Sequence, residues 1–291
     1  MKRPWVAIQR NPTSGTGTRR GVLLELIREL KRHGIRPRLF ASRERMQAKL
    51  ADPAAREQLV CVVAAGGDGT IGDVVNRYPG LPLATLPLGT ENLLAKYLKI
   101  QPSGAQVAEL IASGSRRSLD LGQLNGRRFT LMASCGFDAA VLHRAHASRR
   151  GNIRKWHYLP PIWNSIRKYE HPPVRVFVND EPQPRIARLL LAVNLPKYAY
   201  GIPFAPQATA VDGQLDLCLF ERGSTFQMVR YLGHVLAGRH QSLPDVTCLK
   251  ASRVRIEADV CVPWQMDGDP AGFTPVTLEV LPAALEVFAP E

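Results

Sequence analysis

Cysteines and long apolar runs are scarce in this sequence, and both absences limit what the protein can be. The five cysteines are odd in number and form no CxxC pair, which argues against a disulfide framework or a zinc site and for a reducing cytoplasm. The longest purely apolar run, Leu59–Ala65, is far shorter than the roughly 20 residues of a membrane-spanning helix. The N-terminal segment has no apolar stretch of signal-peptide length. We therefore expect a cytoplasmic protein whose contact with membranes is peripheral.

Composition indicates folded domains with an affinity for anions. The 291 residues suggest two domains, and a hydrophobic content of 45% is too high for a disordered chain. The sequence holds 38 Lys and Arg against 25 Asp and Glu, a formal net charge of +13. Such a surface attracts nucleic acid, an anionic membrane or phosphate-rich ligands.

The window 144–169 combines basic and aromatic residues. No acidic residue occurs within it, and cations beside amphipathic aromatic rings suit the headgroup layer of an anionic membrane. The same mixture also suits single-stranded nucleic acid, and an ordinary solvated helix with buried tryptophans is a third possibility. The residues concerned are Arg144, Arg149, Arg150, Arg154, Lys155, Trp156, Tyr158, Trp163, Arg167, Lys168 and Tyr169.

Residues 1–124 are predicted to form a doubly wound α/β domain, because strand-like and helix-like segments alternate along them. The expected strands are 5–9, 36–41, 59–65 and 83–86, and the expected helices are 21–33, 44–58, 71–78 and 92–98. The apolar run at 59–65 is typical of a central parallel strand buried on both faces.

Residues 125–282 are predicted to form an antiparallel β-sandwich, and residues 283–291 are expected to return to the first domain. Period-two alternation and frequent turn residues characterise this part of the chain. The expected strands are 129–133, 174–179, 186–194, 214–220, 253–260, 276–281 and 285–288, with one helical segment at about 138–168.

The strongest motif is Gly66-Gly67-Asp68-Gly69-Thr70, between the 59–65 strand and a predicted helix. Glycines let the main chain approach a ligand closely, and the free N–H groups of a helix N-terminus bind anions, so phosphate is the expected ligand. Thr70 is expected to cap the helix, with Asp73 as its capping-box partner. Asp68 suits such a site if a magnesium ion lies between it and the phosphates.

Two further glycine-containing loops follow predicted strands. They are Asn11-Pro12-Thr13-Ser14-Gly15-Thr16-Gly17 and Pro87-Leu88-Gly89-Thr90-Glu91-Asn92. Ligands of open α/β sheets bind at the carboxyl ends of the strands, so all three loops are expected to meet at one crevice. The chain contains neither GxxxxGK[ST] nor GxGxxG, so the phosphates are not held in those ways.

The sequence resembles the diacylglycerol kinase catalytic-domain family, in particular its small bacterial lipid kinases. Besides the three loops, the resemblance rests on three motifs in the family's order: Cys135-Gly136-Phe137-Asp138, Ala205-Pro206 with Asp212-Gly213 and Leu215-Asp216, and Asp267-Gly268-Asp269. It covers nearly the whole chain and implies a lipid kinase that uses ATP and Mg²⁺. The Gly-Gly-Asp-Gly core is shared with NAD kinases and phosphofructokinases.

The resemblance also implies roles for individual residues. The ATP site would comprise Asn11, Ser42, Gly66, Gly67, Asp68, Gly69, Thr70, Ile71, Gly72, Gly89, Thr90 and Asn92. Asp269 stands where the family has a glutamate that activates the acceptor hydroxyl, with Asp267 orienting it and Asp68 holding the metal and phosphates. Thr209, Asp212 and the carbonyl of Gln214 match a structural magnesium site, in which Thr209 replaces a longer oxygen ligand.

Two alternatives stay open from the residues alone. The first is an NAD kinase or another small-molecule kinase, which would share the Gly-Gly-Asp-Gly loop. The second is a basic module that binds membranes or nucleic acid and keeps a vestigial kinase site. Intact loops and the Asp-Gly-Asp motif favour a lipid kinase docked at an anionic membrane through the 144–169 window, with no nucleic acid partner.

Overall fold

The computed structural model describes residues 3–10, 20–147, 169–179, 181–197 and 201–290. The chain divides into two compact units, which are Met1–Leu119 with Ala283–Glu291, and Asp120–Pro282. The division lies a few residues before the boundary at 124/125 that the sequence suggested, and the C-terminal residues belong to the first unit. Each unit is described by itself below.

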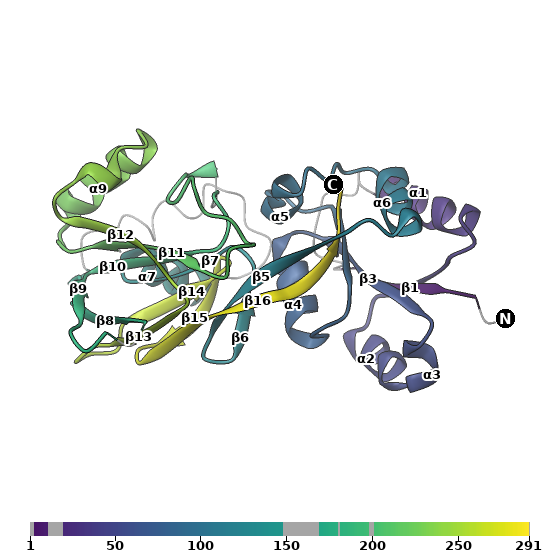
Figure 1. The fold of residues 1–291 in the computed structure, drawn as a ribbon, viewed down its shortest axis with the longest axis horizontal. Coiled ribbons are helices and arrows are strands. Elements are labelled where there is room, and N and C mark those ends of the chain that lie inside the picture. Colours follow the sequence, from purple (N-terminus) through teal and green to yellow (C-terminus); the bar gives the residue numbers. More distant parts are fainter. Residues whose placement is uncertain (1–2, 11–19, 148–168, 180, 198–200, 291) are drawn as a thin grey trace. The chain divides into compact units, whose positions relative to one another are not determined.

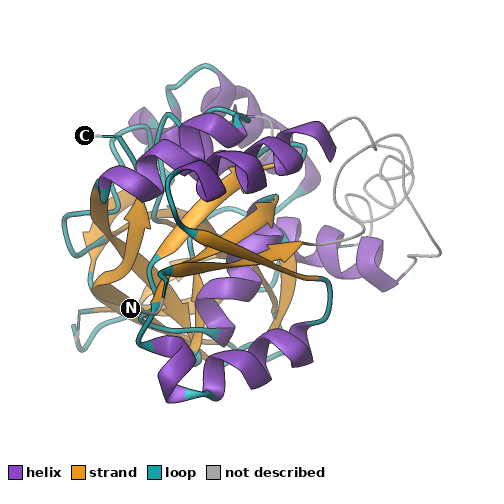
Figure 2. Cartoon of the chain, turned by 90° about the vertical axis from the view of Figure 1, so that its right-hand side faces the viewer, coloured by secondary structure: helices purple, strands orange, loops and turns teal. Residues whose placement is uncertain are grey.

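The first unit is a parallel sheet with helices on both faces, as predicted (Figures 1 and 2). Its strands follow the order β2-β1-β3-β4-β16, where the end of β16 joins β4 in parallel through Val287 and Leu83. The strands are β1 (Trp5–Arg10), β2 (Arg36–Phe40), β3 (Leu59–Gly66) and β4 (Leu83–Pro87). The helices are α1 (Arg20–Arg32), α2 (Arg43–Ala51), α3 (Pro53–Arg56), α4 (Asp68–Arg77), α5 (Leu93–Tyr97) and α6 (Gly104–Ser113).

The single helix expected over 44–58 is in fact two helices, because Asp52 and Pro53 interrupt it. Proline has no N–H to donate into a continuing helix. Asp52 ends α2 and begins α3, where its carboxylate accepts a hydrogen bond from the Ala54 N–H at 3.1 Å. An aspartate at the N-cap followed by proline at the first helical position is a strong start signal, and it overrides the helical pattern across the break.

The second unit is an antiparallel sandwich of two sheets, which confirms the predicted class. One sheet has the order β16-β13-β8-β9 with β5 and β6 attached, and the other has the order β12-β11-β10-β7-β14-β15. The strands are β5 (Arg116–Leu124), β6 (Arg127–Phe129), β7 (Met132–Cys135), β8 (Val174–Val178), β9 (Arg185–Ala187), β10 (Leu189–Val193), β11 (Leu215–Phe220), β12 (Val246–Ala251), β13 (Arg253–Glu257), β14 (Pro263–Met266), β15 (Asp269–Phe273) and β16 (Val276–Phe288).

The core of the sandwich lies between the two sheets. Val176 and Leu278 of one sheet and Leu217 and Trp264 of the other belong to one buried cluster. Alternate residues of β8 and β13 face this core while their neighbours are less buried, which is the period-two pattern that the sequence displays. At roughly 25 cal/mol per Å² of buried apolar surface, this layer is the main source of stability of the unit.

Several strands differ from the prediction. The strand expected over 129–133 is divided between β6 and β7, and neither β5 nor β12 was expected. The strand expected over 186–194 is divided at Arg188 into β9 and β10, and the strands expected at 276–281 and 285–288 form one continuous β16. The hairpin of β14 and β15 includes the Asp-Gly-Asp motif, which the sequence analysis left outside any strand.

Helices of the second unit are α7 (Phe137–Ala147), α9 (Thr225–Leu236) and the short 3₁₀ turn η4 (His240–Ser242). The remainder of the helical segment expected over 138–168 lies outside the described residues. Helix α9 lies beside β12 (Figure 1). Met228, Tyr231 and Val235 of this helix share a buried cluster with Phe220 and Val246 of the sheet. Among the described residues, no helix combines the length and hydropathy that crossing a bilayer requires.

Candidate active site

The loops after β3 and β4 touch each other through their main chains. A Cβ atom built on Gly89 would lie 2.4 Å from the Gly67 Cα, and one built on Gly67 would lie 3.1 Å from the Gly89 Cα. Real Cβ atoms essentially never approach backbone as closely as 2.4 Å, so position 89 requires glycine, and at position 67 a Cβ would fit only if the neighbouring backbone shifted by a few tenths of an ångström. The Leu88 N–H donates to the Gly66 carbonyl at 2.9 Å, which extends the pairing of the two strands into the loops. Two of the three predicted loops therefore meet at one edge of the sheet.

Asn92 fixes the conformation of the loop after β4. Its side-chain oxygen accepts a hydrogen bond from the Gly89 N–H, and its amide nitrogen donates to the Gly89 carbonyl, both at 2.9 Å. Its own backbone is left-handed, with φ at 51°, a conformation that asparagine tolerates better than most residues. The two hydrogen bonds of Asn92 thus fix the turn in which Gly89 contacts Gly67. Thr90, in the same loop, is exposed.

Asp68 connects the two loops through a side chain. Its carboxylate accepts hydrogen bonds from the N–H groups of Leu93 (3.0 Å) and Leu94 (3.2 Å), the first residues of α5. The Asp68 carboxylate therefore caps the N-terminus of α5, the helix that follows the loop after β4. Burial raises the pKa of this carboxyl above its usual range, although the two backbone donors oppose the rise because they favour the charged form.

The N-terminus of α4 is formed differently from the prediction. The helix begins at Asp68 with Gly67 as N-cap, so Thr70 is not the cap and Asp73 is not a capping-box partner. Thr70 and Ile71 are buried, and their N–H groups donate to the Gly67 carbonyl at 2.9 and 3.2 Å. The sequence could not separate these cases, because glycine and threonine both cap helices and the loop contains both.

The remaining nucleotide-site candidates occupy different positions around this sheet edge. Asn11 lies outside the described residues. Ser42 follows β2 and is the N-cap of α2, where its hydroxyl oxygen accepts from the Arg45 N–H at 3.2 Å. Gly69 is exposed and Gly72 is half-buried within α4. Ser42 thus lies at the carboxyl edge of the sheet, where ligands of open α/β sheets bind, and its contact with a nucleotide stays a prediction.

In the second unit, the Asp267-Gly268-Asp269 motif is a two-residue hairpin turn. Met266 of β14 pairs with Asp269 of β15, and the two residues between them have φ values of 50° and 87°. Positive φ at both central positions defines a type I′ turn, for which Asp-Gly is a preferred pair. The motif thereby presents Asp269, which is exposed, at the first position of β15.

Asp267 anchors this turn to the start of β7. Its carboxylate accepts four hydrogen bonds, from the N–H groups of Thr130 (2.8 Å), Leu131 (2.9 Å) and Met132 (3.1 Å) and from the Thr130 hydroxyl (3.0 Å). Burial raises the pKa of Asp267 to about 6 despite these donors. A carboxylate occupied by four donors positions the turn and has little capacity left for a substrate.

The residues matched to a structural magnesium site are arranged differently from a metal cage. The ammonium of Lys250 forms an ion pair with the Asp212 carboxylate and lies 3.8 Å from a carboxylate oxygen of Asp216. The other Asp212 oxygen accepts from the Gln214 N–H at 3.1 Å. Magnesium prefers several oxygen ligands in octahedral geometry, and here a lysine supplies the positive charge instead. With Thr209, these residues as arranged do not fit a magnesium ion.

Asp138, from the Cys-Gly-Phe-Asp motif, lies in a buried polar network at the start of α7. One carboxylate oxygen accepts from the Ser134 hydroxyl, whose oxygen accepts from the Gln265 side-chain amide at 2.5 Å. The other oxygen has no hydrogen-bond partner among the described residues. Burial raises the pKa of Asp138 to about 6. The sequence identified the motif but did not predict that Ser134 and Gln265 would form a hydrogen-bond network with Asp138. Ser134 lies on β7 and Gln265 on β14, two strands far apart in the chain.

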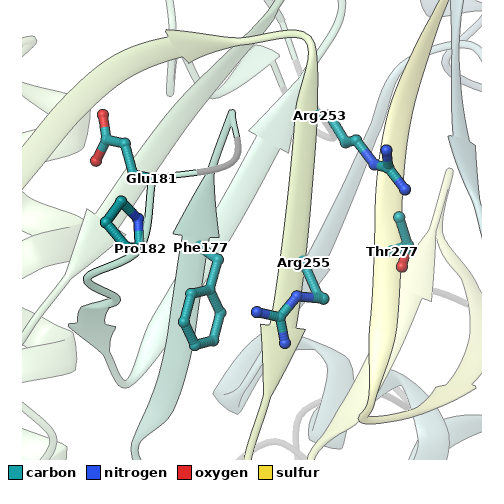
Figure 3. A pocket seen from close by; sticks show the side chains of 6 residues that line it. All are labelled: Phe177, Glu181, Pro182, Arg253, Arg255 and Thr277. Carbon is teal, nitrogen blue, oxygen red and sulfur yellow. The ribbon is translucent and has the colours of Figure 1, made fainter.

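A surface pocket of the second unit lies apart from these residues (Figure 3). It has a volume of about 260 Å³ and is lined by Phe177, Glu181, Pro182, Arg253, Arg255 and Thr277. Both arginines are paired with acidic side chains, since Arg253 contacts Glu279 at 3.3 Å and Arg255 contacts Glu257. Because the charges are already neutralised and no predicted site residue lines it, this pocket carries no part of the candidate site.

Comparison with known proteins agrees with both units. The diacylglycerol kinase catalytic domain matches residues 6–124, and the YegS C-terminal NAD kinase beta sandwich-like domain matches residues 132–289. The diacylglycerol kinase of Mycobacterium tuberculosis (strain ATCC 25618 / H37Rv) is 28% identical, covering 96% of this chain and 93% of that protein. The diacylglycerol kinase of Staphylococcus epidermidis (strain ATCC 12228 / FDA PCI 1200) is 25% identical, covering 97% and 90%.

A solved structure shares the fold. The crystal structure of a diacylglycerol kinase from Bacillus anthracis str. Sterne superposes with a TM-score of 0.72 at 20% identity, covering 99% of this chain and 97% of that one. An α/β catalytic domain followed by a β-sandwich defines the class as two-domain kinases of the diacylglycerol kinase type. The chain belongs to the family that combines the diacylglycerol kinase catalytic domain with the YegS C-terminal NAD kinase beta sandwich-like domain.

Proposed function

We propose that this protein is an ATP-dependent lipid kinase that transfers the γ-phosphoryl group of ATP to a lipid hydroxyl, diacylglycerol or a related lipid. One observation carries the proposal: the backbone contact between Gly67 and Gly89 beside the N-terminus of α4. Such a contact leaves an anion-binding helix end without side chains that would block a phosphate.

The first unit supplies the phosphate site. Because the N–H groups of Thr70 and Ile71 already bond to Gly67, the amides of Gly67, Asp68 and Gly69 are the ones assigned to the phosphates. The exposed Thr90 hydroxyl and the Ser42 hydroxyl are assigned to the rest of the nucleotide. Stabilisation of a phosphoryl-transfer transition state is mostly positioning and charge neutralisation, which suits fixed backbone donors.

The Asp68 carboxylate suits a magnesium ion held mainly by the ATP phosphates. Magnesium bound in this way takes only one or two protein carboxylates. Each Asp68 oxygen accepts one N–H from α5 and keeps further acceptor capacity. When bound, the ion neutralises charge on the β- and γ-phosphates. The capping bonds fix the direction in which Asp68 presents its remaining lone pairs.

Asp269 is assigned as the general base that accepts the proton of the lipid hydroxyl. Its carboxylate is exposed at the end of a turn that Asp267 holds in place. Aspartate is one methylene shorter than glutamate, so its reach depends on the backbone. The type I′ turn, anchored by four hydrogen bonds to residues 130–132, provides that fixed backbone.

Contact with a lipid surface is proposed at α9 as well as at the basic-aromatic window. Most of that window lies outside the described residues. On α9, four apolar side chains form an exposed stripe at helical spacing: Phe226 (74% exposed), Val229 (62%), Leu232 (47%) and Leu236 (62%). The opposite face of the same helix is buried in the unit. An apolar stripe of this kind enters the headgroup layer of a membrane readily.

Charge at both ends of α9 favours an anionic lipid surface as the partner. Arg239 follows the helix and is exposed, whereas Arg222, which precedes the helix and is also exposed, pairs with Asp245 at 3.5 Å; the whole chain carries a net charge of +13. Each Lys or Arg close to such a surface contributes about 1 kcal/mol. A peripheral contact of this kind would bring the kinase to its acceptor.

Replacing Phe226 by glutamate is expected to weaken binding to phosphatidylglycerol vesicles by about tenfold or more. Burial of a phenylalanine side chain is worth about 1.5–3 kcal/mol, and the new charge is repelled by the lipid. Vesicle sedimentation measures the effect. The matched control is Leu24→Glu on α1, a side chain 55% exposed in the first unit. Equal binding of Phe226→Glu and the wild type to the vesicles would contradict the lipid contact at α9. So would a variant that binds vesicles as the wild type does but no longer self-associates.

A kinase that acts on NAD is the second candidate, because the sandwich domain matches a family described as NAD kinase beta sandwich-like. Measuring ATP consumption with extracted lipids, with NAD and with neither distinguishes the candidates. Consumption only with lipids is expected. Consumption only with NAD would replace the proposal, and no consumption with either would favour a binding module with a vestigial site.

A further inference from the structure

Three side chains with metal-binding atoms converge on one face of the second unit's sandwich. Cys218 lies on β11, Cys248 lies on β12 and His240 begins η4. Their ligand atoms all lie within 4.8 Å of one another. Cys218 and Cys248 are directly opposite each other in the antiparallel ladder, so the sheet itself sets the spacing of the two sulfur atoms.

The cluster is buried but accessible on one side. Cys218 is fully buried and His240 is 1% exposed, whereas Cys248 is half-buried. A site of this kind excludes competing ligands and keeps a path for an ion to enter beside Cys248. Neither the phosphate loops nor the Asp267–Asp269 turn contributes a residue to it.

A carbonyl group fixes the tautomer of His240. The Nε2 atom lies 2.8 Å from the Phe204 carbonyl oxygen, which can only accept, so Nε2 carries the proton and donates it. Nδ1 is consequently an unprotonated acceptor, and it has no hydrogen-bond partner among the described residues. A histidine that donates one N–H to a backbone carbonyl and presents its other nitrogen to thiols has the usual arrangement of a metal ligand.

The sulfur atoms have the spacing of a tetrahedral site. The two Sγ atoms lie 3.6 Å apart. Two thiolates on one zinc ion, each bonded at about 2.3 Å with tetrahedral angles, are separated by roughly 3.8 Å. A disulfide would instead need an S–S distance of about 2.05 Å, a much larger displacement.

We propose that Cys218, Cys248 and His240 form a site for a thiophilic d¹⁰ cation, with Zn²⁺ as the probe, whose fourth position opens beside Cys248. Binding forms two S–metal bonds and one N–metal bond and releases to solvent the protons that the two thiols still hold. The bound ion would join η4 to β11 and β12. The sequence argued against a zinc site because no CxxC occurs. A CxxC motif brings two sulfur atoms together through adjacent residues, whereas here the antiparallel pairing of residues 218 and 248 brings them together.

The test uses the full-length protein, stripped of metal with a chelator and kept reduced. Zinc stoichiometry and affinity are measured by competition with a chromophoric chelator, and Co²⁺ substitution reports thiolate coordination through its charge-transfer and visible bands. We expect one Zn²⁺ per chain. Cys248→Ser, a nearly isosteric change at the half-buried position, should weaken affinity at least 10-fold, as should His240→Gln. Cys261→Ser, which alters an exposed cysteine outside the cluster, is the control and should bind as the wild type does.

Several outcomes would overturn the proposal. Unchanged affinity in folded Cys248→Ser, with circular dichroism matching the wild type, would exclude the site. Absence of zinc binding by the reduced wild type would exclude it too. If the reduced protein binds no zinc while air oxidation removes two thiols, the pair forms a cross-strand disulfide instead. Kinase activity is not a readout here, so failure of the metal site and failure of the proposed function are distinguishable.

Discussion

Replacing Asp269 by asparagine is expected to lower kcat by about 10²–10⁴-fold while the affinity for ATP stays close to that of the wild type. Asparagine has the same size as aspartate but cannot accept the proton of the acceptor hydroxyl. The side chain is exposed, so the change removes no buried contact from the fold. Steady-state kinetics with a lipid acceptor, together with a nucleotide-binding isotherm, measure both parts of the expectation.

Two further variants test whether a loss of activity in Asp269→Asn is caused by the loss of the base. Asp269→Glu restores the residue that the family resemblance implies and should keep most of the activity. Asp259→Asn is the matched control, because Asp259 is an exposed aspartate of the same unit that pairs only with Arg175 in the ion pairs of the described residues. Turnover of Asp269→Asn close to that of the wild type would remove Asp269 from the role of base.

Replacing Gly89 by alanine is expected to weaken ATP binding by about 10- to 100-fold. The new Cβ would lie 2.4 Å from the Gly67 Cα and 2.7 Å from the Asn92 side-chain oxygen, so the backbone of both loops must move. Overpacking of this kind costs about 1–3 kcal/mol, and here it displaces the amides assigned to the phosphates. Isothermal titration with ATP and Mg²⁺ gives the change in affinity.

Gly21→Ala is the control for this substitution. Gly21 lies in α1 of the same unit, and a Cβ built on it meets nothing within 4 Å. It should bind ATP as the wild type does. ATP affinity unchanged in Gly89→Ala would mean that the contact between the two loops is not part of the nucleotide site.

The sequence predicted those features that follow from short stretches of chain. The apolar run of β3 indicated a buried parallel strand, which the structure confirms, and the glycines after it indicated a close backbone approach, which the Gly67–Gly89 contact shows. The binding of phosphate by this loop stays a prediction. Alternation in β8 and β13 indicated the sandwich. In each case, local periodicity and the conformational freedom of glycine were sufficient.

Features that depend on distant partners could not be predicted in this way. Asp267 resembles any turn aspartate in sequence, yet its carboxylate accepts hydrogen bonds from residues about 135 positions earlier. No motif in the sequence around His240 indicates that this side chain is buried beside Cys218 and Cys248. These arrangements arise from strand register and from sheet order, which one sequence does not display.

The most direct measurement of the central claim follows the label of γ-³²P-ATP in the presence of Mg²⁺ and extracted bacterial lipids. The account predicts that label enters an organic-soluble lipid phosphate with the wild type and that Gly89→Ala and Asp269→Asn both reduce this transfer. Label that appears only in NADP or inorganic phosphate, or transfer to lipid that both variants leave unchanged, would contradict it.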